Sequence, residues 1–255
     1  MERLGRKPFQ GVTNIIRFNW HYYVIALAVI VIAILVQRFL PDPIRIISAV
    51  VLLLAFLSIA ISLVASWYIY DYSGLYTLNW LDELNIGPDN QLVNINAGFD
   101  ETSYLLKVKY PGCHLEVFDF YDPAKHTEIS IERARKAYPA YPGTETITTS
   151  KIPLKENLAD YIFLVLAAHE IRNDEERILF FRQVENVLKT NGKIIVVEHQ
   201  RDIYNFMAYN IGFFHFFSTK TWKNTFNGAK LTIDKEFKIT SFISAFVLTK
   251  NGTAT

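Results

Sequence analysis

Apolar residues are concentrated in two long runs in the first third of the chain. No charged residue lies between Tyr22 and Val36 or between Ile46 and Tyr70. A helix of roughly 20 residues spans a hydrocarbon core of about 30 Å. The second run exceeds that length, and the first reaches it when its flanking residues are included. Both runs are therefore candidate membrane spans.

The segment Pro41-Asp42-Pro43 separates the two runs and can continue neither helix. We therefore expect a transmembrane helical hairpin over residues 21–70. A buried helical pair and a cleaved signal peptide are the alternatives. The signal peptide fits poorly, because about twenty residues precede the first run and no small-residue cleavage pattern follows it.

Basic residues set the expected orientation of this hairpin. Four precede the first run and two flank the turn: Arg3, Arg6, Lys7 and Arg17, against Arg38 and Arg45. Basic residues favour the cytoplasmic side, so residues 1–20 are expected in the cytoplasm. Two crossings return the chain to that side. The sequence predicts an integral protein of the cytoplasmic or inner membrane with a cytoplasmic domain.

The rest of the chain alternates strand-like and helix-like segments. After an expected linker helix within residues 71–90, strands are predicted at 92–96, 114–120, 144–150, 160–168 and 193–199, and helices at 101–110, 128–137 and 173–190. This alternation predicts a doubly wound parallel α/β sheet. The runs 231–239 and 242–249 are joined by a short link and are expected to pair antiparallel at an edge. Residues 91–255 should form one domain with a seven-stranded sheet.

The bulk composition excludes some classes of partner. A net charge of +1 and a pI near 7.8 give no basic footprint for nucleic acid. The single cysteine, Cys113, cannot form an internal disulfide and suits a reducing compartment. The mean hydropathy of +0.14 reflects the two apolar runs.

One local pattern carries the candidate chemistry. The first predicted strand runs into a tight turn at Gly98 and then a helix start near Thr102. The second predicted strand follows, and its last acidic residue is Asp119. A carboxylate at that place accepts hydrogen bonds from ribose hydroxyls in nucleotide-binding sheets. The pattern predicts a nucleotide-type cofactor at the carboxyl ends of these two strands.

A longer likeness covers roughly residues 85–250. The sheet order, the glycine turn and the terminal hairpin, together with the segments 152–154, 160–161, 180–184 and 187–193, resemble the class I S-adenosylmethionine-dependent methyltransferases. The last of these segments, Val187-Leu188-Lys189-Thr190-Asn191-Gly192-Lys193, is similar to the family's V-L-K-P-G-G run. The resemblance implies a Rossmann-like methyltransferase fold and S-adenosylmethionine as cofactor.

The family's first motif, D-x-G-x-G-x-G, falls on residues 94–100. Gly98 keeps the central glycine, whereas asparagine or aspartate stands at the acid and at the other two glycines. The acid expected near the adenine is replaced by a Thr-Thr-Ser segment. The resemblance implies cofactor contacts from Asn94, Asn96, Ala97, Gly98, Asp119, Phe120, Thr149, Ser150 and Ala168.

Residues after the fourth and fifth strands are placed to meet a methyl acceptor. We predict His169, Glu170 and His199 as catalytic residues, with His169 as a general base. In the structural alternative, His169 and Glu170 cap the next helix or pair with Arg172. A metal site that adds Glu198 was also considered, but zinc-type spacing is absent and no metal is expected.

The segment 203–217 is unusually aromatic. It would line a pocket for an apolar acceptor, lie at the membrane interface, or cover the sheet as a buried helix. The combined prediction is a membrane-anchored methyltransferase acting on a lipid-like or membrane-associated small molecule. The main alternative is a catalytically silent methyltransferase-like protein with an interaction or regulatory role, because two motif glycines are lost. A dinucleotide oxidoreductase is a weaker third possibility.

Overall fold

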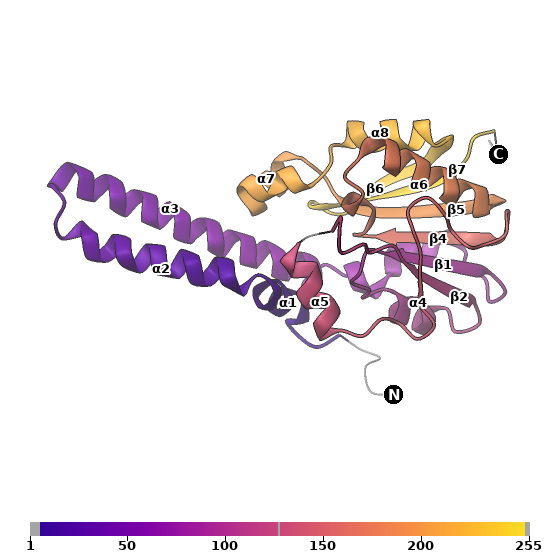
Figure 1. Cartoon of the computed structure of the whole chain (residues 1–255), viewed down its shortest axis with the longest axis horizontal. Helices are drawn as coiled ribbons and strands as arrows, with labels where there is room; N and C mark the ends of the chain where they lie inside the picture. The colour runs from indigo at the N-terminus through magenta and orange to yellow at the C-terminus, as the bar shows by residue number, and fades with distance from the viewer. Residues whose placement is uncertain (1–5, 127, 253–255) are drawn as a thin grey trace.

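The structure is a computed structural model that describes residues 6–126 and 128–252. Two long helices, α2 (Trp20–Gln37) and α3 (Asp42–Trp67), form a hairpin that extends away from an α/β domain (Figure 1). Both helices are long and apolar enough to cross a membrane, and their apolar stretches are not buried by the rest of the protein. The structure therefore contains the predicted helical hairpin.

A further helix precedes the hairpin. Helix α1 (Gln10–Phe18) packs against α3 and against α5 (Ile129–Ala137) of the domain. The carboxylate of Asp71 accepts hydrogen bonds from the backbone N–H groups of Gly11 and Val12 at 2.7 and 2.9 Å. Because these donors lie in the first turn of α1, the carboxylate satisfies groups that the helix itself leaves unpaired.

The expected linker helix is a series of short turns in the structure. A π-helical turn, η1 (Tyr68–Tyr72), follows α3, and two 3₁₀ turns, η2 (Leu75–Thr77) and η3 (Asn79–Leu84), come next. The side chains of Leu75, Leu78 and Leu81 are buried against the sheet. The segment therefore belongs to the domain's core and is more than a tether.

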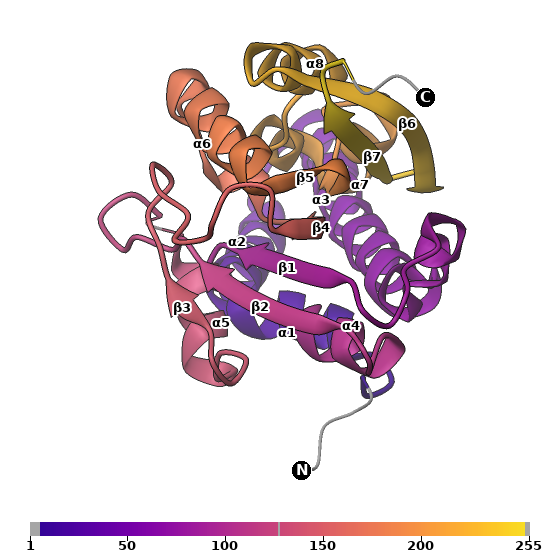
Figure 2. The ribbon, with the colours of Figure 1, turned by 90° about the vertical axis from the view of Figure 1, so that its right-hand side faces the viewer.

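The domain contains a seven-stranded sheet. Its order is β3-β2-β1-β4-β5-β7-β6 (Figure 2), with the strands β1 (Gln91–Asn96), β2 (His114–Asp119), β3 (Glu145–Thr146), β4 (Ala159–Val165), β5 (Leu188–His199), β6 (Leu231–Thr240) and β7 (Ile243–Lys250). The first five strands pair in parallel, and β7 pairs antiparallel with β5 and β6. The predicted fold class is confirmed.

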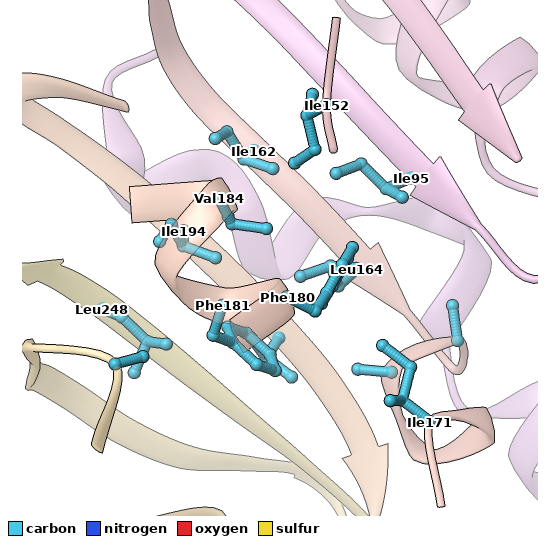
Figure 3. Packing of buried hydrophobic residues seen from close by; sticks show 14 of the residues in the cluster. Ile95, Ile152, Ile162, Leu164, Ile171, Phe180, Phe181, Val184, Ile194 and Leu248 are labelled. Atoms are coloured by element: carbon cyan, nitrogen blue, oxygen red, sulfur yellow. The ribbon is translucent and has the colours of Figure 1, made fainter. Parts of the chain in front are cut away.

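Helices cover the two faces of the sheet. Helices α6 (Asp174–Val187) and α8 (Thr219–Gly228) pack on one face with the turns that follow β4. Figure 3 shows Phe180 of α6 beside Leu164 of β4, and Val184 of α6 near Ile162 of β4. The other face is covered by residues 69–84 and by α4 (Ser103–Lys109). Helix α7 (Ile203–Tyr209) lies beyond the carboxyl end of β5, where Asn205 hydrogen-bonds His199, and it contacts α3 (Figure 1).

Several predicted boundaries were wrong, and two of them have a clear cause in the packing. Helix α6 ends at Val187, five residues before Gly192, because Leu188 already pairs with Ala159 across a bulge. A Cβ at Gly192 would lie 2.7 Å from Leu188 Cδ1 and 3.0 Å from the Ala159 carbonyl oxygen, so this glycine permits a close strand approach. The third strand is only β3, since it lies at an edge and pairs with β2 over two residues.

Candidate functional site

The glycine turn lies directly after β1. Gly98 has φ +95°, and a Cβ there would lie 2.9 Å from Cδ2 of Tyr121. Its N–H donates to the side-chain oxygen of Asn96 at 3.1 Å, and the Asn96 amide donates to the Phe118 carbonyl at 3.0 Å. Asn96 therefore connects the turn to the neighbouring strand β2. The positive φ and the closeness of the Tyr121 ring both favour glycine at position 98.

A second polar group supports the start of α4. The Asn94 amide donates to the hydroxyls of Thr102 and Ser103 at 3.1 and 2.8 Å. Asp100 Oδ1 accepts the backbone N–H groups of the same two residues, both at 2.9 Å. Asn94 Oδ1 and Asp100 Oδ2 are buried and have no hydrogen-bond partner among the described residues. A buried acceptor without a partner is unfavourable, so these two atoms suit a ligand that donates N–H groups.

Asp119 lies at the end of β2, beside the turn. One carboxylate oxygen accepts the N–H of Tyr121 at 2.8 Å, and the other forms an ion pair with Arg135 of α5. The Arg135 guanidinium also lies 4.5 Å from the centre of the Tyr121 ring and donates to the Gly98 carbonyl at 3.3 Å. The Arg135 side chain thus occupies the space beside Asp119 in which a ribose is predicted to bind.

Helix α1 lies over the same turn. The Phe18 ring meets the rings of Phe99 and Tyr138 edge to face, with centroids 5.7 and 6.2 Å apart. The Tyr138 hydroxyl donates to Asn14 Oδ1 at 2.9 Å, and Arg133 donates to the Phe18 carbonyl at 2.6 Å. Since Phe99 directly follows Gly98, α1 forms a cover over the glycine turn.

The other residues predicted to contact the cofactor lie in different surroundings. The Phe120 ring packs against Phe180 in the core, and Ala168 is fully buried. The Thr149 hydroxyl donates to Glu176 near the start of α6, and Ser150 hydrogen-bonds Thr148. Ala97 is buried beside the turn. The structure groups Asn94, Asn96, Ala97, Gly98 and Asp119, and the cofactor roles of the remaining residues stay predictions.

A second cluster forms where β4 and β5 end. His169 and Glu170 lie in the 3₁₀ turn η4 (Ala168–Glu170), and Glu198 is fully buried in β5. The ring atom Nδ1 of His169 donates to Glu198 Oε2 at 2.7 Å, and the backbone N–H of His169 donates to Glu198 Oε1 at 3.2 Å. His169 Nε2 lies 3.2 Å from Glu170 Oε1. Carboxylates therefore flank both ring nitrogens of His169.

A second histidine joins the cluster from a distant segment. His215 ends the 3₁₀ helix η5 (Asn210–His215), and its Nε2 lies 3.7 Å from Glu170 Oε1. Its Nδ1 lies 3.1 Å from Glu128 Oε1. The ring centroids of His169 and His215 are 5.1 Å apart. Sequence reasoning missed His215 and Glu128, and a lone histidine within an aromatic segment was the only available signal.

The electrostatics of the cluster favour positive charge. Burial alone lowers the pKa of His169, but the charge of Glu198 and hydrogen bonds to Glu170 and Glu198 outweigh it. The pKa of His169 is consequently well above its usual value. Burial alone raises the pKa of Glu170, but its interactions with the nearby His169 and His215 rings lower it overall. A proton or another cation is therefore stabilised beside the Glu170 carboxylate.

His199 is not brought into contact with His169 and Glu170. Its Nδ1–H donates to Asn205 Oδ1 at 2.9 Å, so its Nε2 accepts the Tyr70 hydroxyl at 2.8 Å. The ring stacks on Phe216, with centroids 4.5 Å apart. Burial lowers the pKa of His199 to about 4. The structure thus holds His199 neutral within a hydrogen-bond network, and its catalytic role stays a prediction.

No protein-family model matches this sequence, and comparison with curated proteins gives no match. Among solved structures, a SAM dependent methyltransferase from Aquifex aeolicus matches with a TM-score of 0.50 and 15% identity, covering 71% of this chain and 94% of that chain. The PH0226 protein from Pyrococcus horikoshii OT3 matches with a TM-score of 0.52 and 14% identity, covering 70% and 90%. The domain has the class I methyltransferase fold. At these identities the similarity concerns the fold, and function has to be argued from the site.

Proposed function

We propose that this protein is a membrane-anchored S-adenosylmethionine-dependent methyltransferase whose acceptor is a lipid-like or membrane-associated small molecule. The observation that carries the proposal is Asp119 at the end of β2 beside the Gly98 turn, within a methyltransferase fold. The carboxyl ends of parallel strands are where ligands bind in such sheets. The His169 cluster lies at the ends of β4 and β5, along the same edge.

The residues around the turn fit the cofactor chemically. The Asp119 carboxylate would accept the ribose hydroxyls, and Asn94 Oδ1 and Asp100 Oδ2 would accept N–H groups of the amino acid end. When bound, the cofactor supplies an electrophilic methyl group on a sulfonium. Arg135 has to leave Asp119 before a ribose can bind there. Its side chain is 37% exposed, so it can move into solvent without opening the core.

The acceptor is proposed to lie against the His169 cluster. Alignment of donor and acceptor provides most of the acceleration in such a transfer. His169 and Glu170 would contact the acceptor, and the Glu170 carboxylate would accept a hydrogen bond from its nucleophilic group. The raised pKa of His169 favours its protonated form, so its role here would be to orient Glu170 and the acceptor. Glu198 keeps the His169 ring in one orientation through two hydrogen bonds. Arg172 donates to the carbonyls of His169 and His215 at 3.1 and 2.6 Å, which differs from the expected side-chain pair with His169 and Glu170.

The segment that contains α7 and η5 supports a membrane-associated acceptor. Met207 and Ile211 are 64% and 82% exposed, and other exposed apolar side chains of the segment are Ile203, Tyr204, Phe206 and Phe214. Asn210 donates to the Ser58 hydroxyl of α3 at 2.7 Å, so the segment lies alongside a candidate membrane helix. Exposed apolar groups at that level are stabilised by lipid. The segment ends at His215, so it connects the proposed membrane-facing side chains to the His169 cluster.

The N-terminal contacts support the proposed topology. Helix α1 precedes the hairpin, yet it binds the domain through Asn14 and Phe18. The two ends of the hairpin therefore meet the same domain, as an even number of crossings requires. Together with the basic residues before α2, this supports a cytoplasmic placement of both the N-terminal segment and the domain.

Calorimetry of the full chain in detergent with S-adenosylmethionine tests the proposal. We expect saturable binding that Asp119→Ala abolishes, while Asp234→Ala, at an exposed aspartate of β6, leaves binding unchanged. If neither the wild type nor Arg135→Ala binds at millimolar cofactor, the proposal is wrong. The silent methyltransferase-like alternative would then account for the chain.

A further inference from the structure

We propose that His169, His215 and Glu170 bind a divalent transition metal ion, zinc in the first instance. The ligands would be the two Nε2 atoms and the Glu170 carboxylate. These groups come from two segments, η4 and the end of η5, and their potential ligand atoms all lie within 4.8 Å of one another. Imidazole and carboxylate together suit zinc and related ions.

The distances agree with one shared ion. Two ligands of a tetrahedral zinc ion, each about 2.0–2.1 Å from the metal, lie about 3.3 Å apart. Glu170 Oε1 lies 3.2 Å from His169 Nε2 and 3.7 Å from His215 Nε2. The second distance is too long for a good hydrogen bond but close to the spacing of two ligands. Small side-chain rotations would complete a three-ligand site with one open position.

Both histidines are also oriented as metal ligands usually are. The Nδ1 atom of His169 faces Glu198 at 2.7 Å, and that of His215 faces Glu128 at 3.1 Å. A carboxylate on the far nitrogen fixes the ring, keeps Nε2 available and makes it a better ligand. Both rings have such a carboxylate, although Glu198 belongs to β5 and Glu128 is the residue before α5. Packing alone would not require that symmetry.

A guanidinium holds the two ligand-bearing segments together. Arg172 Nη1 donates to the backbone carbonyls of both His169 and His215. Its hydrogen bonds go to these carbonyls, whereas the three carboxylates of the cluster face the histidine rings. The cluster therefore carries an excess of negative groups that a divalent cation would balance. Arg172 acts here as a positioning residue.

This proposal replaces the expectation that no metal binds. Local spacing in the sequence could not show the site, because His215 lies far along the chain from His169 and Glu170. Metal binding itself stands apart from the proposed methyl transfer. Its catalytic consequence rests on that proposed function: an ion with an open position would bind an acceptor hydroxyl and lower its pKa.

The test uses the full chain in detergent, treated with a chelator and then titrated with zinc chloride in a calorimeter. We expect one zinc ion per chain. His215→Gln and Glu170→Gln should lower the affinity by at least about 100-fold. Glu128→Gln keeps every ligand and should lower it by about 10- to 100-fold, because only ring orientation is lost. His114→Gln, at an exposed histidine at the start of β2, is the matched control and should bind as the wild type does.

Cobalt replaces zinc in a second readout, in which the ligand-field absorption reports coordination by the histidines. His215 and Glu128 are partly exposed, so their variants should fold, and circular dichroism checks this. The proposal is overturned if the wild type binds no zinc, or if His215→Gln and Glu128→Gln bind as tightly as the control. Asp119→Ala should lose the methyl donor but keep zinc, so failure of the metal site and failure of the proposed function are distinguishable.

Discussion

The ion pair between Arg135 and Asp119 makes a quantitative prediction about cofactor affinity. Before a ribose can reach Asp119, the guanidinium must give up the carboxylate and its position over Tyr121. A partly exposed ion pair contributes up to about 1 kcal/mol, and a cation–π contact at an exposed site about 0.5–1 kcal/mol. Arg135→Ala removes these competing contacts, so we expect binding to strengthen by about 1–2 kcal/mol, or roughly 5- to 30-fold.

The assay is calorimetric titration of the full chain in detergent with S-adenosylmethionine, and separately with its demethylated product. Lys136→Ala is the control, because Lys136 is the next residue of α5 and is paired with Glu132 at the surface. Weaker binding by Arg135→Ala would refute the reasoning, since Arg135 would then contact the bound cofactor. Unchanged affinity would mean that the ion pair does not compete with the ribose.

Three further predictions concern the turn, the buried histidine and the topology. Gly98→Ala should lower the free energy of unfolding by about 1–2 kcal/mol through φ strain, and by more through the clash with Tyr121; Gly143→Ala, with φ +83° and nothing within 4 Å, should show the φ strain alone in thermal unfolding. Because burial lowers the pKa of His199 to about 4, the unfolded state takes up a proton first as pH falls from about 6.5. Stability should then drop by up to about 3 kcal/mol by pH 4, and the melting temperature of His199→Gln should lack this part of the pH dependence. In a Cys113→Ser background, a cysteine replacing Asp42 should react with a membrane-impermeant thiol reagent in intact cells, whereas one replacing Lys220 should react only after lysis; the reverse pattern would contradict the proposed topology.

Local patterns were enough to predict the sheet and the Gly98 turn. Strand and helix periodicity depend on neighbouring residues, and Gly98 and Asp119 lie within one strand–helix–strand unit. Predicted element ends were less accurate where tertiary contacts set the end of a helix or strand. Helix α6, for example, ends at Val187 because Leu188 pairs with β4.

The contacts that define the candidate site could not be predicted in the same way. The Arg135–Asp119 pair depends on which face of α5 turns toward the sheet. The approach of His215 to Glu170 depends on how η5 returns from the side of α3. Helix α1 did have a local signal, an amphipathic pattern in residues 10–18, but nothing in that pattern indicates that it covers the glycine turn.

The connection between α1 and α2 couples the proposed membrane anchor to the glycine turn. Only Asn19 separates the helix that covers the glycine turn from the first candidate membrane span. A shortened protein that begins after residue 70 would therefore lose more than the proposed membrane anchor. It would lack Phe18 and Asn14, and with them their contacts to Phe99 and Tyr138 beside the glycine turn. The proposed membrane segment and the helix that covers the glycine turn are one continuous piece of chain, so a truncation that removes the hairpin also changes the surroundings of Gly98.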